Sequence, residues 1–267
     1  MLDQFAERWA LITGASSGIG AEFARRLAGR GMHLVLVARR EEKLNELAQE
    51  LHTAHGTETV VIPTDLSITG SAADLFRQVQ ERNIDIELLV NNAGFGVVGP
   101  IENTDPAEVR RMLQVNIQAV SDLCYLILPQ MLERQHGAVI NVSSLSAFQP
   151  VAYMAAYAAS KSWILHFSEA MWAEVRNRGV TVQALCPGAT STGFFESAGI
   201  SNWLEKHTSQ SPQKVVKTSL KALEKRRQFV VSGWKNYLIT IAVRLATRRT
   251  AVKESMKYFR PRISKDE

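Results

Sequence analysis

Tyr157 and Lys161 stand four residues apart in a chain of 267 residues, and together they could carry out acid–base chemistry. Four residues make about one helical turn, so both side chains are expected on the same face of a helix. A nearby ammonium group stabilises a phenolate and lowers the pKa of a tyrosine below its ordinary value of about 10. The pair therefore suits a proton donor that works near neutral pH.

The spacing alone is weak evidence for a site. With five Tyr and eleven Lys, a chain of this length contains Tyr-x-x-x-Lys by chance about one time in five. A surface pair at positions i and i+4 is the alternative interpretation. Ser144 precedes Tyr157 by thirteen residues. The predicted strands and helices that would position these side chains decide whether the residues form a site or only a surface pair.

Segments typical of strands and helices alternate from Trp9 onwards. The strand-like runs end in polar or glycine residues, which are Gly14, Ala38-Arg39, Asp65, Asn91, Ser143-Ser144 and Pro187-Gly188. Such an alternation predicts parallel strands joined by right-handed crossovers. The predicted fold is of the α/β class, a single doubly wound (Rossmann) parallel sheet with helices on both faces. Its polar strand ends would form one ligand-binding edge.

A glycine turn follows the first predicted strand, Trp9 to Thr13, and precedes a helical pattern. Glycine lets the backbone approach a ligand, and the helix N-terminus offers N–H groups and a positive dipole to a pyrophosphate. The spacing G-x-x-x-G-x-G differs from the commoner G-x-G-x-x-G, and a turn between packed elements is the alternative. The expected cofactor contacts here are Gly14, Ser16, Ser17, Gly18, Ile19 and Gly20.

The second strand ends in Ala38-Arg39-Arg40, where an NAD-specific fold would carry an acidic residue for the ribose. A guanidinium binds a 2′-phosphate in bidentate fashion, whereas a carboxylate would repel it. We therefore expect NADP(H) in preference to NAD(H), with Arg39 as the main contact. The alternative is a solvated helix start, because two Glu and a Lys follow directly.

Two further strand ends supply candidate cofactor contacts. Asp65 could accept a hydrogen bond from the adenine amino group, or it could cap a helix. The strand from Ile86 to Val90 leads into two asparagines, an alanine and a glycine. The contacts expected from these two ends are Asp65, Leu66, Asn91, Ala93 and Gly94, and Pro187 and Gly188 are expected to join them.

The helical segment from Glu108 to Leu132 carries Asn116 among apolar residues. A buried carboxamide needs hydrogen-bond partners. Asn116 could therefore bridge backbone groups for purely structural reasons.

Composition limits the class of protein. With 46% hydrophobic and 21% charged residues, the chain fits one large globular domain or a domain with an appendage. The spacing of Cys124 and Cys186 indicates neither a disulfide framework nor a metal site. The first residues lack the apolar core of a secretory signal, and the longest late apolar run is too short to span a membrane, so we expect a cytoplasmic protein.

The net charge of +5 conceals an asymmetry. From residue 214 onwards there are 15 Lys and Arg against 4 Asp and Glu, while residues 1–213 carry a net charge of −6. We expect a catalytic domain over residues 1–235 and a basic amphipathic extension over 236–267. Nucleic-acid binding is disfavoured, because the body is acidic and the basic segment lacks interleaved aromatic residues.

The extension predicts an apolar helical face bordered by basic residues. The apolar positions are Leu238, Ile241, Ala242, Leu245, Val252, Met256 and Phe259, with Arg244, Arg248, Lys253, Lys257 and Arg260 at the edges. Packing on the body or an oligomer contact is the preferred interpretation. An anionic membrane surface or an acidic acyl carrier is the alternative.

Six motifs stand in the order and spacing typical of the short-chain dehydrogenase/reductase family, which the chain resembles from about Trp9 to Thr192. They are T-G-A-S-S-G-I-G at residues 13–20, N-N-A-G at 91–94, the lone Asn116, Ser144, Y-x-x-x-K at 157–161 and P-G-x-x-x-T at 187–192. Any one motif is weak, but six in register make the resemblance specific. The body most resembles hydroxysteroid-dehydrogenase and ketoacyl-reductase-like members.

The resemblance implies a role for each matching residue. Tyr157 would be the general acid for a carbonyl oxygen, Ser144 would polarise that carbonyl, and Lys161 would lower the pKa of Tyr157 and hold the nicotinamide ribose. Asn116 would hold a water that links Lys161 to solvent. Thr192 would meet the nicotinamide carboxamide or the phosphates.

Some positions qualify these roles. The thirteen-residue spacing favours Ser144 over Ser143, which is then a structural hydroxyl. Relatives that use NADP often carry a basic residue where this chain has Ser17, so Arg39 would have to do more of the discrimination. A region resembling the variable substrate lid spans about residues 190–211. Its apolar residues, which suit a hydrophobic substrate or simply dock the lid, are Phe194, Phe195, Ile200 and Trp203.

The resemblance implies an NADP(H)-dependent oxidoreductase that transfers hydride between the nicotinamide and a carbonyl or secondary alcohol of an apolar or acyl substrate. No metal is needed for this chemistry. The family also suggests a homodimer or homotetramer formed through the helices at 108–132 and 157–178. The alternatives are a non-catalytic NADP-binding sensor or scaffold, and a peripheral membrane protein that acts through its C-terminal helix.

Overall fold

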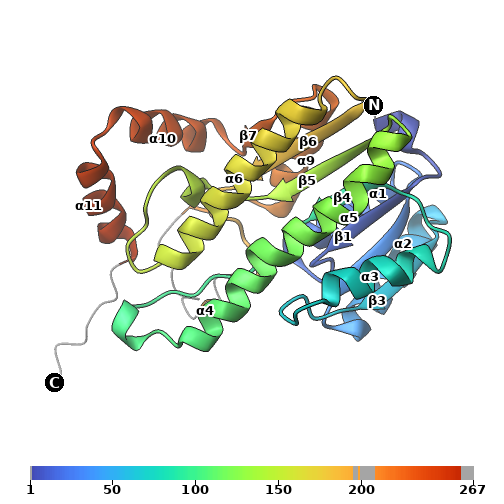
Figure 1. Cartoon of the computed structure of the whole chain (residues 1–267), viewed down its shortest axis with the longest axis horizontal. Coiled ribbons are helices and arrows are strands. Elements are labelled where there is room, and N and C mark those ends of the chain that lie inside the picture. The colour runs from blue at the N-terminus through green and yellow to red at the C-terminus, as the bar shows by residue number, and fades with distance from the viewer. Residues whose placement is uncertain (1, 195–197, 199–207, 260–267) are drawn as a thin grey trace.

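Seven parallel strands form one sheet in the order β3-β2-β1-β4-β5-β6-β7 (Figure 1). The computed structural model describes residues 2–194, 198 and 208–259. The strands are β1 (Trp9–Thr13), β2 (His33–Ala38), β3 (Thr59–Pro63), β4 (Ile86–Asn91), β5 (Gly137–Val142), β6 (Val180–Cys186) and β7 (Phe229–Val231). The chain runs outwards from β1 to β3 and then crosses back to β4. This doubly wound order confirms the predicted fold class.

Burial on both faces explains why these segments form strands. Every residue of β4, β5 and β6 is buried, so the strands read as nearly continuous apolar runs. Alternate residues of β2 face opposite layers: Leu34 and Leu36 pack in one apolar cluster, and Val35 and Val37 pack in the other.

Helices cover both faces of the sheet (Figure 1). The helices are α1 (Gly18–Ala28), α2 (Glu41–His55), α3 (Ser71–Gln80), α4 (Pro106–Leu113), α5 (Ala119–Glu133), α6 (Ala155–Val175), α9 (Pro212–Glu224), α10 (Trp234–Leu245) and α11 (Arg248–Phe259). Buried residues of α1, α2 and α9 share one core cluster, while those of α3, α5 and α6 share the other. Tyr157 and Lys161 both lie on α6, as predicted.

The predicted helix over Glu108 to Leu132 is interrupted. A π-helical turn, Gln114–Gln118, separates α4 from α5, and Asn116 lies within it. A π turn widens the backbone, and such turns often mark functional sites.

The C-terminal extension forms two helices instead of one. Ala246, the residue after α10, has extended backbone angles (φ −78°, ψ 152°), and α11 begins at Arg248. The residues from Leu238 to Met256 therefore do not share one helical face, which corrects the prediction. The side chain of Phe259 and residue Arg260 lie outside what the structure describes. Among the described residues, no helix is long and apolar enough to cross a membrane.

Candidate active site

A cavity of about 1310 Å³ opens along the carboxyl edge of the sheet. A site for one small molecule usually measures about 300–1,000 Å³, so this cavity has room for a dinucleotide and a second molecule. The strand-end residues that line it are Gly14, Ala38, Arg39, Asp65, Ala93, Gly94, Ser143, Ser144, Pro187 and Gly188. The predicted ligand edge thus forms one continuous site.

The glycine turn packs tightly against its neighbours. Gly14 and Gly18 have φ angles of +66° and +57°, which side-chain-bearing residues rarely adopt. A Cβ atom on Gly20 would come within 2.3 Å of the Gly14 carbonyl oxygen, and one on Gly18 within 2.8 Å of Thr192 Cγ2. Gly14, Ser16, Ser17, Gly18 and Ile19 line the cavity, as does Thr192. This cradle ahead of the α1 N-terminus fits a pyrophosphate.

The Arg40 side chain reaches the glycine turn, a contact that the sequence did not predict. Its guanidinium donates hydrogen bonds to the hydroxyl oxygens of Ser16 (3.0 Å) and Ser17 (3.1 Å), so it lies over the glycine turn. Both Arg39 and Arg40 are exposed and line the cavity. Arg40 thus places a positive charge beside Ser17, where relatives that use NADP often carry a basic residue.

Asp65 accepts hydrogen bonds from the backbone N–H (2.9 Å) and the hydroxyl (2.7 Å) of Ser67. Burial raises the pKa of Asp65, but these hydrogen bonds and the charge of Arg39 more than offset it, so its pKa is lowered. The carboxylate therefore shapes the turn after β3 while it lines the cavity beside the buried Leu66.

Asn91 does not reach the cavity. Its carboxamide turns into the core, where it donates to Asn141 Oδ1 at 2.9 Å. The next residue, Asn92, lines the cavity and donates to the carbonyl oxygens of Thr13 (2.9 Å) and Gly14 (3.2 Å). Successive residues of a strand point in opposite directions, which explains why the expected role of the Asn91 side chain was wrong.

Asn116 is fully buried and holds the loop after β4. Its carboxamide accepts from the Phe95 N–H (3.2 Å) and donates to the Phe95 carbonyl (3.0 Å) and to Ser160 Oγ (3.2 Å). Its oxygen lies near Gly94, as does Lys161 Nζ. The side chain thus bridges backbone and α6, and the water-holding role stays a prediction.

Tyr157 and Ser144 meet at the floor of the cavity. Burial raises the pKa of Tyr157 to about 12, while a side-chain hydrogen bond with Ser144 acts in the opposite direction. The Ser144 oxygen also accepts from the Ser146 N–H at 3.1 Å, because Ser144 caps the short 3₁₀ helix Leu145–Phe148. Ser144 is therefore fixed in position by the turn that follows it.

Lys161 lies one turn below Tyr157. Its Nζ donates to the Val142 carbonyl at 2.9 Å and is 5.8 Å from the centroid of the Tyr157 ring. Burial lowers the pKa of Lys161 to about 8. Burial is the larger influence on the pKa of Tyr157, so the tyrosine keeps its proton, and the role of Lys161 in lowering that pKa stays a prediction.

Ser143 has the structural role that was predicted for it. Its buried hydroxyl donates to the main-chain carbonyl of Lys161 at 2.6 Å. This bond ties the end of β5 to α6 and so fixes the lysine relative to Ser144.

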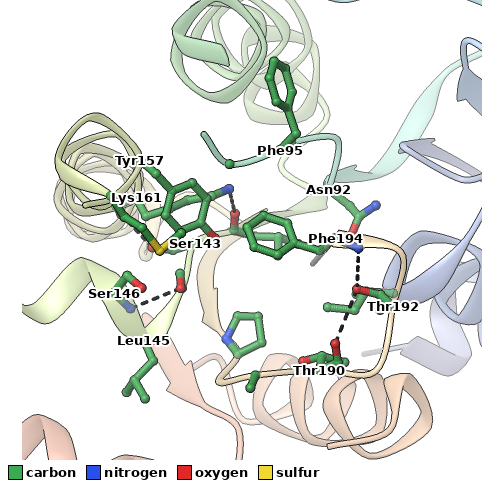
Figure 2. A pocket seen from close by; sticks show the side chains of 18 of the residues that line it. Asn92, Phe95, Ser143, Leu145, Ser146, Tyr157, Lys161, Thr190, Thr192 and Phe194 are labelled. Atoms are coloured by element: carbon green, nitrogen blue, oxygen red, sulfur yellow. Dashed lines mark hydrogen bonds between the residues drawn. The ribbon is translucent and has the colours of Figure 1, made fainter. Parts of the chain in front are cut away.

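The far wall of the cavity comes from the lid and the C-terminal extension. The Phe194 ring packs 5.3 Å from that of Tyr157, centroid to centroid (Figure 2). The wall residues from α10, α11 and their link are Asn236, Ile239, Ala242, Val243, Ala246, Thr250, Ala251, Glu254 and Ser255. Ser255 Oγ accepts from the Ala152 N–H at 3.2 Å, so α11 packs on the body. The lid residues Phe195, Ile200 and Trp203 lie outside what the structure describes.

The sequence model of the short chain dehydrogenase family matches residues 8–202. The chain belongs to this family. The match covers the glycine turn, Asn116, Ser144, Tyr157 and Lys161, and so includes many of the residues that line the cavity. Members of the family bind a nicotinamide cofactor and small-molecule substrates, and they commonly form oligomers.

Two curated short-chain dehydrogenase relatives bear names that differ on activity. The chain is 35% identical over 190 residues to the very-long-chain 3-oxoacyl-CoA reductase of Anas platyrhynchos, covering 69% of this chain and 60% of that protein. It is 36% identical over 191 residues to the inactive hydroxysteroid dehydrogenase-like protein 1 of Homo sapiens, covering 70% and 57%. The chain thus spans less than two thirds of the length of either relative.

Solved short-chain dehydrogenase structures resemble nearly the whole chain. A 7beta-hydroxysteroid dehydrogenase superposes with a TM-score of 0.85 at 29% identity, covering 95% of this chain and 98% of that one. A short-chain dehydrogenase from Sphingobium yanoikuyae with NADPH gives 0.81 at 29% identity, covering 97% and 99%. One from Burkholderia phymatum with NAD gives 0.81 at 25% identity, covering 90% and 93%. These structural neighbours therefore include complexes with either nicotinamide cofactor.

Proposed function

We propose that this short-chain dehydrogenase is an NADP(H)-dependent oxidoreductase that interconverts a carbonyl and a secondary alcohol on an apolar or acyl substrate. The observation that carries this proposal is the hydrogen-bonded pair of Tyr157 and Ser144 on the cavity floor, with Lys161 one turn below. Two neighbouring hydroxyl groups that line the cavity can both donate to a carbonyl oxygen on which negative charge develops.

Tyr157 is the general acid in the direction of reduction. The bound nicotinamide cofactor supplies hydride to the carbonyl carbon when it is reduced, and accepts hydride when it is oxidised. An alkoxide is a stronger base than a phenolate, so a tyrosine with a pKa of about 12 still donates its proton readily. Because the pKa is this high, Tyr157 is fully protonated and ready to donate at neutral pH.

Ser144 and Lys161 support that proton transfer. The Ser144 oxygen accepts from the Ser146 N–H, and its own O–H can donate to the substrate oxygen. Lys161, with a pKa of about 8, carries its positive charge at neutral pH and stabilises the phenolate that proton transfer leaves behind. We expect the same ammonium to contact the nicotinamide ribose and Thr192 to contact the cofactor.

The preference for NADP(H) rests on two arginines. Arg39 and Arg40 both line the cavity at the end of β2, and Arg40 is held over the glycine turn by Ser16 and Ser17. Guanidinium groups in this position suit an additional phosphate on the adenosine ribose. Asp65 and Leu66 would contact the adenine.

The substrate side of the cavity is mainly apolar. Its walls include Val151, Met154, Phe194, Ile239 and Val243. A ketone or 3-oxoacyl thioester with a substantial apolar body would bury its surface here. The names of the relatives, a 3-oxoacyl-CoA reductase and a hydroxysteroid dehydrogenase, support the same substrate class.

A homo-oligomer formed through α5 and α6 is part of the proposal. On these helices the ring of Trp163 stacks on that of Phe167 at 4.5 Å, and the exposed Tyr125 packs 6.0 Å from Phe167, centroid to centroid. Exposed aromatic residues of this kind are enriched in protein interfaces. We place the protein in the cytoplasm.

The test is a panel of apolar ketones, aldehydes and 3-oxoacyl thioesters, assayed with NADPH and NADH for the wild-type chain and for Tyr157→Phe. We expect turnover with NADPH in the wild type and at least a 100-fold loss in the variant, with NADPH binding retained. Tyr125→Phe, which removes an exposed hydroxyl on α5, is the matched control and keeps full activity.

A non-catalytic NADP-binding sensor is the second candidate, and the relative named as inactive favours keeping it in view. A sensor needs none of the Asn116, Ser144, Tyr157 and Lys161 set. Equal carbonyl reduction by wild type and Tyr157→Phe would refute the mechanism. Tight NADPH binding without turnover across the whole panel would favour the sensor.

A further inference from the structure

Helix α10 lines the cavity with one side, where Ile239 is still 44% exposed, and carries a second exposed side that points away from the cavity. Asn236, Ile239 and Val243, spaced three and four residues apart, line the cavity. The opposite side of the helix carries the exposed residues Trp234, Tyr237, Leu238, Ile241 and Leu245. Their spacing places all five in one stripe. The exposed fractions of Trp234 (71%), Leu238 (52%) and Leu245 (84%) show that the described residues leave this stripe uncovered.

Basic residues border the stripe on α10 and recur along α11. Lys235 and Arg244 stand at its two edges on α10. On α11, Val252 and Met256 are also exposed. Residues 234–257 contain six Lys and Arg, which are Lys235, Arg244, Arg248, Arg249, Lys253 and Lys257. The single acid in this range, Glu254, pairs with Lys257 at 2.7 Å. The arm formed by α10 and α11 (residues 234–259) therefore combines the apolar stripe of α10 with a strongly basic composition.

We propose that this arm lies in the interface of an anionic lipid bilayer, with the outer stripe of α10 embedded among the headgroups. Trp and Tyr combine an apolar ring with a polar group, which suits them to that depth. Lys and Arg bury their aliphatic stems and keep the charged end beside lipid phosphates. In Figure 1 α10 and α11 extend beyond α6 at the edge of the molecule, which leaves the arm accessible to a flat surface.

Charge favours a lipid surface over a second copy of this chain. A two-fold interface through the arm would place the same patch on both sides, so each set of cations would face an identical set. Like charges directly opposed destabilise such a contact, whereas an anionic leaflet attracts each Lys or Arg near it by about 1 kcal/mol, or roughly fivefold in binding. On the side of α10 that faces the body, Thr240 is buried and Asn236 and Val243 are half-buried.

The proposal rests on the outer face alone and does not depend on the proposed reaction. Its test is flotation of the full chain with vesicles of neutral phosphatidylcholine, and with vesicles containing about a third phosphatidylserine or phosphatidylglycerol. We expect flotation with the anionic vesicles and little with the neutral ones, and a loss of binding as salt rises, because salt screens exposed charges. Absence of flotation with anionic vesicles at low salt would overturn the proposal.

Matched variants separate the apolar and the charged contributions. Leu238→Gln with Ile241→Gln should weaken binding at least tenfold, whereas Ile101→Gln, which replaces a still more exposed isoleucine elsewhere, should not. Arg248→Gln with Arg249→Gln should weaken binding by roughly 30-fold. Lys217→Gln with Lys221→Gln on α9 is the charge-matched control. Equal losses in the controls would overturn the assignment to the arm.

Two further measurements test whether the stripe contacts lipid or a second copy of the chain. Trp234 fluorescence should be quenched by lipids brominated along the acyl chain, and the quenched component should disappear in Trp234→Phe. Sedimentation in the absence of lipid should give the same oligomeric state for the wild type and for Leu238→Gln with Ile241→Gln. A dimer that dissociates in that variant would show that the stripe binds a second copy and would refute the lipid proposal.

Discussion

The side-chain nitrogen of Asn236 lies so close to Gly188 that a Cβ atom on that glycine would come within 2.4 Å of it. Gly188 belongs to the loop after β6, and Asn236 to the first turn of α10. Asn236 also donates to the Ser232 carbonyl at 2.7 Å. The C-terminal arm is therefore joined to the catalytic edge by direct contact.

Gly188→Ala should lower kcat/KM by at least tenfold, because the new methyl group must displace the carboxamide of Asn236, which lines the cavity. Contacts under 3.0 Å cannot be accommodated without movement. Steady-state kinetics with a substrate from the panel measure the effect. Asn236→Gly in the same chain should restore much of the activity. A double variant no better than Gly188→Ala would indicate that the contact does not couple the two segments.

Ser143 and Ser144 should respond to alanine in opposite ways. Ser143→Ala removes a buried hydrogen bond to the Lys161 carbonyl, so thermal unfolding should show a loss of about 1–2 kcal/mol. Ser144→Ala removes a donor to the developing alkoxide, so kcat should fall by roughly 100-fold with a smaller effect on stability. A reversal of these two outcomes would exchange the roles assigned to the serines.

Arg40→Gln should reduce the preference for NADPH over NADH by about 10-fold or more, because a charged hydrogen bond to phosphate contributes about 1.5–3 kcal/mol. Arg39→Gln should act in the same direction. Fluorescence titration with both cofactors measures the ratio of the two dissociation constants. Lys43→Gln, an exposed substitution on α2 where Lys43 pairs with Glu46 at 2.7 Å, is the control. An unchanged ratio in both arginine variants would remove the basis for NADP(H) selectivity.

Lys161→Met should raise the stability of the fold at pH 7 while abolishing activity. Burial lowers the pKa of Lys161 from 10.5 to about 8, so folding pays for a buried charge whenever the lysine is protonated in both states. That cost is fully present below pH 8 and disappears as pH rises towards 10.5. After the loss of the hydrogen bond to Val142, the net gain at pH 7 should be about 1–2 kcal/mol.

Urea unfolding at pH 7 and pH 10 measures this gain. The difference between Lys161→Met and wild type should shrink at the higher pH. A gain that stays constant between the two pH values would show that packing, and not the charge, is responsible. Lys217→Met on α9, where the lysine is exposed, is the control and should show little change at either pH.

The sheet and the catalytic floor could be predicted because they rest on local patterns. Buried parallel strands appear as apolar runs, and the spacing of Tyr157 and Lys161 fixes their common helix face. The apolar pattern of a strand does not show which of two adjacent asparagines at its end points its side chain into the cavity. Asn91 was therefore predicted as the contact, whereas Asn92 lines the cavity. The reach of Arg40 to Ser16 and Ser17 depends on a side-chain conformation that no spacing encodes.

Local spacing could not predict the effect of burial on the pKa of Tyr157 or the two-helix form of the arm. The i,i+4 rule describes exposed helices, whereas burial dominates at this site and raises the pKa to about 12. The apolar pattern of residues 236–259 continues through Ala246, although the backbone there is extended and starts a second helix. Packing of the arm on the body, the preferred interpretation, is supported by the contact between Ser255 and Ala152.

One wall of the active-site cavity comes from residues beyond the end of the family match at 202, since α10 begins at Trp234. The residues proposed to bind the nucleotide and to move the proton come from the matched region. During evolution, or in protein engineering, the segment after Gly233 could therefore be exchanged as a cassette that alters substrate choice and leaves the redox chemistry intact.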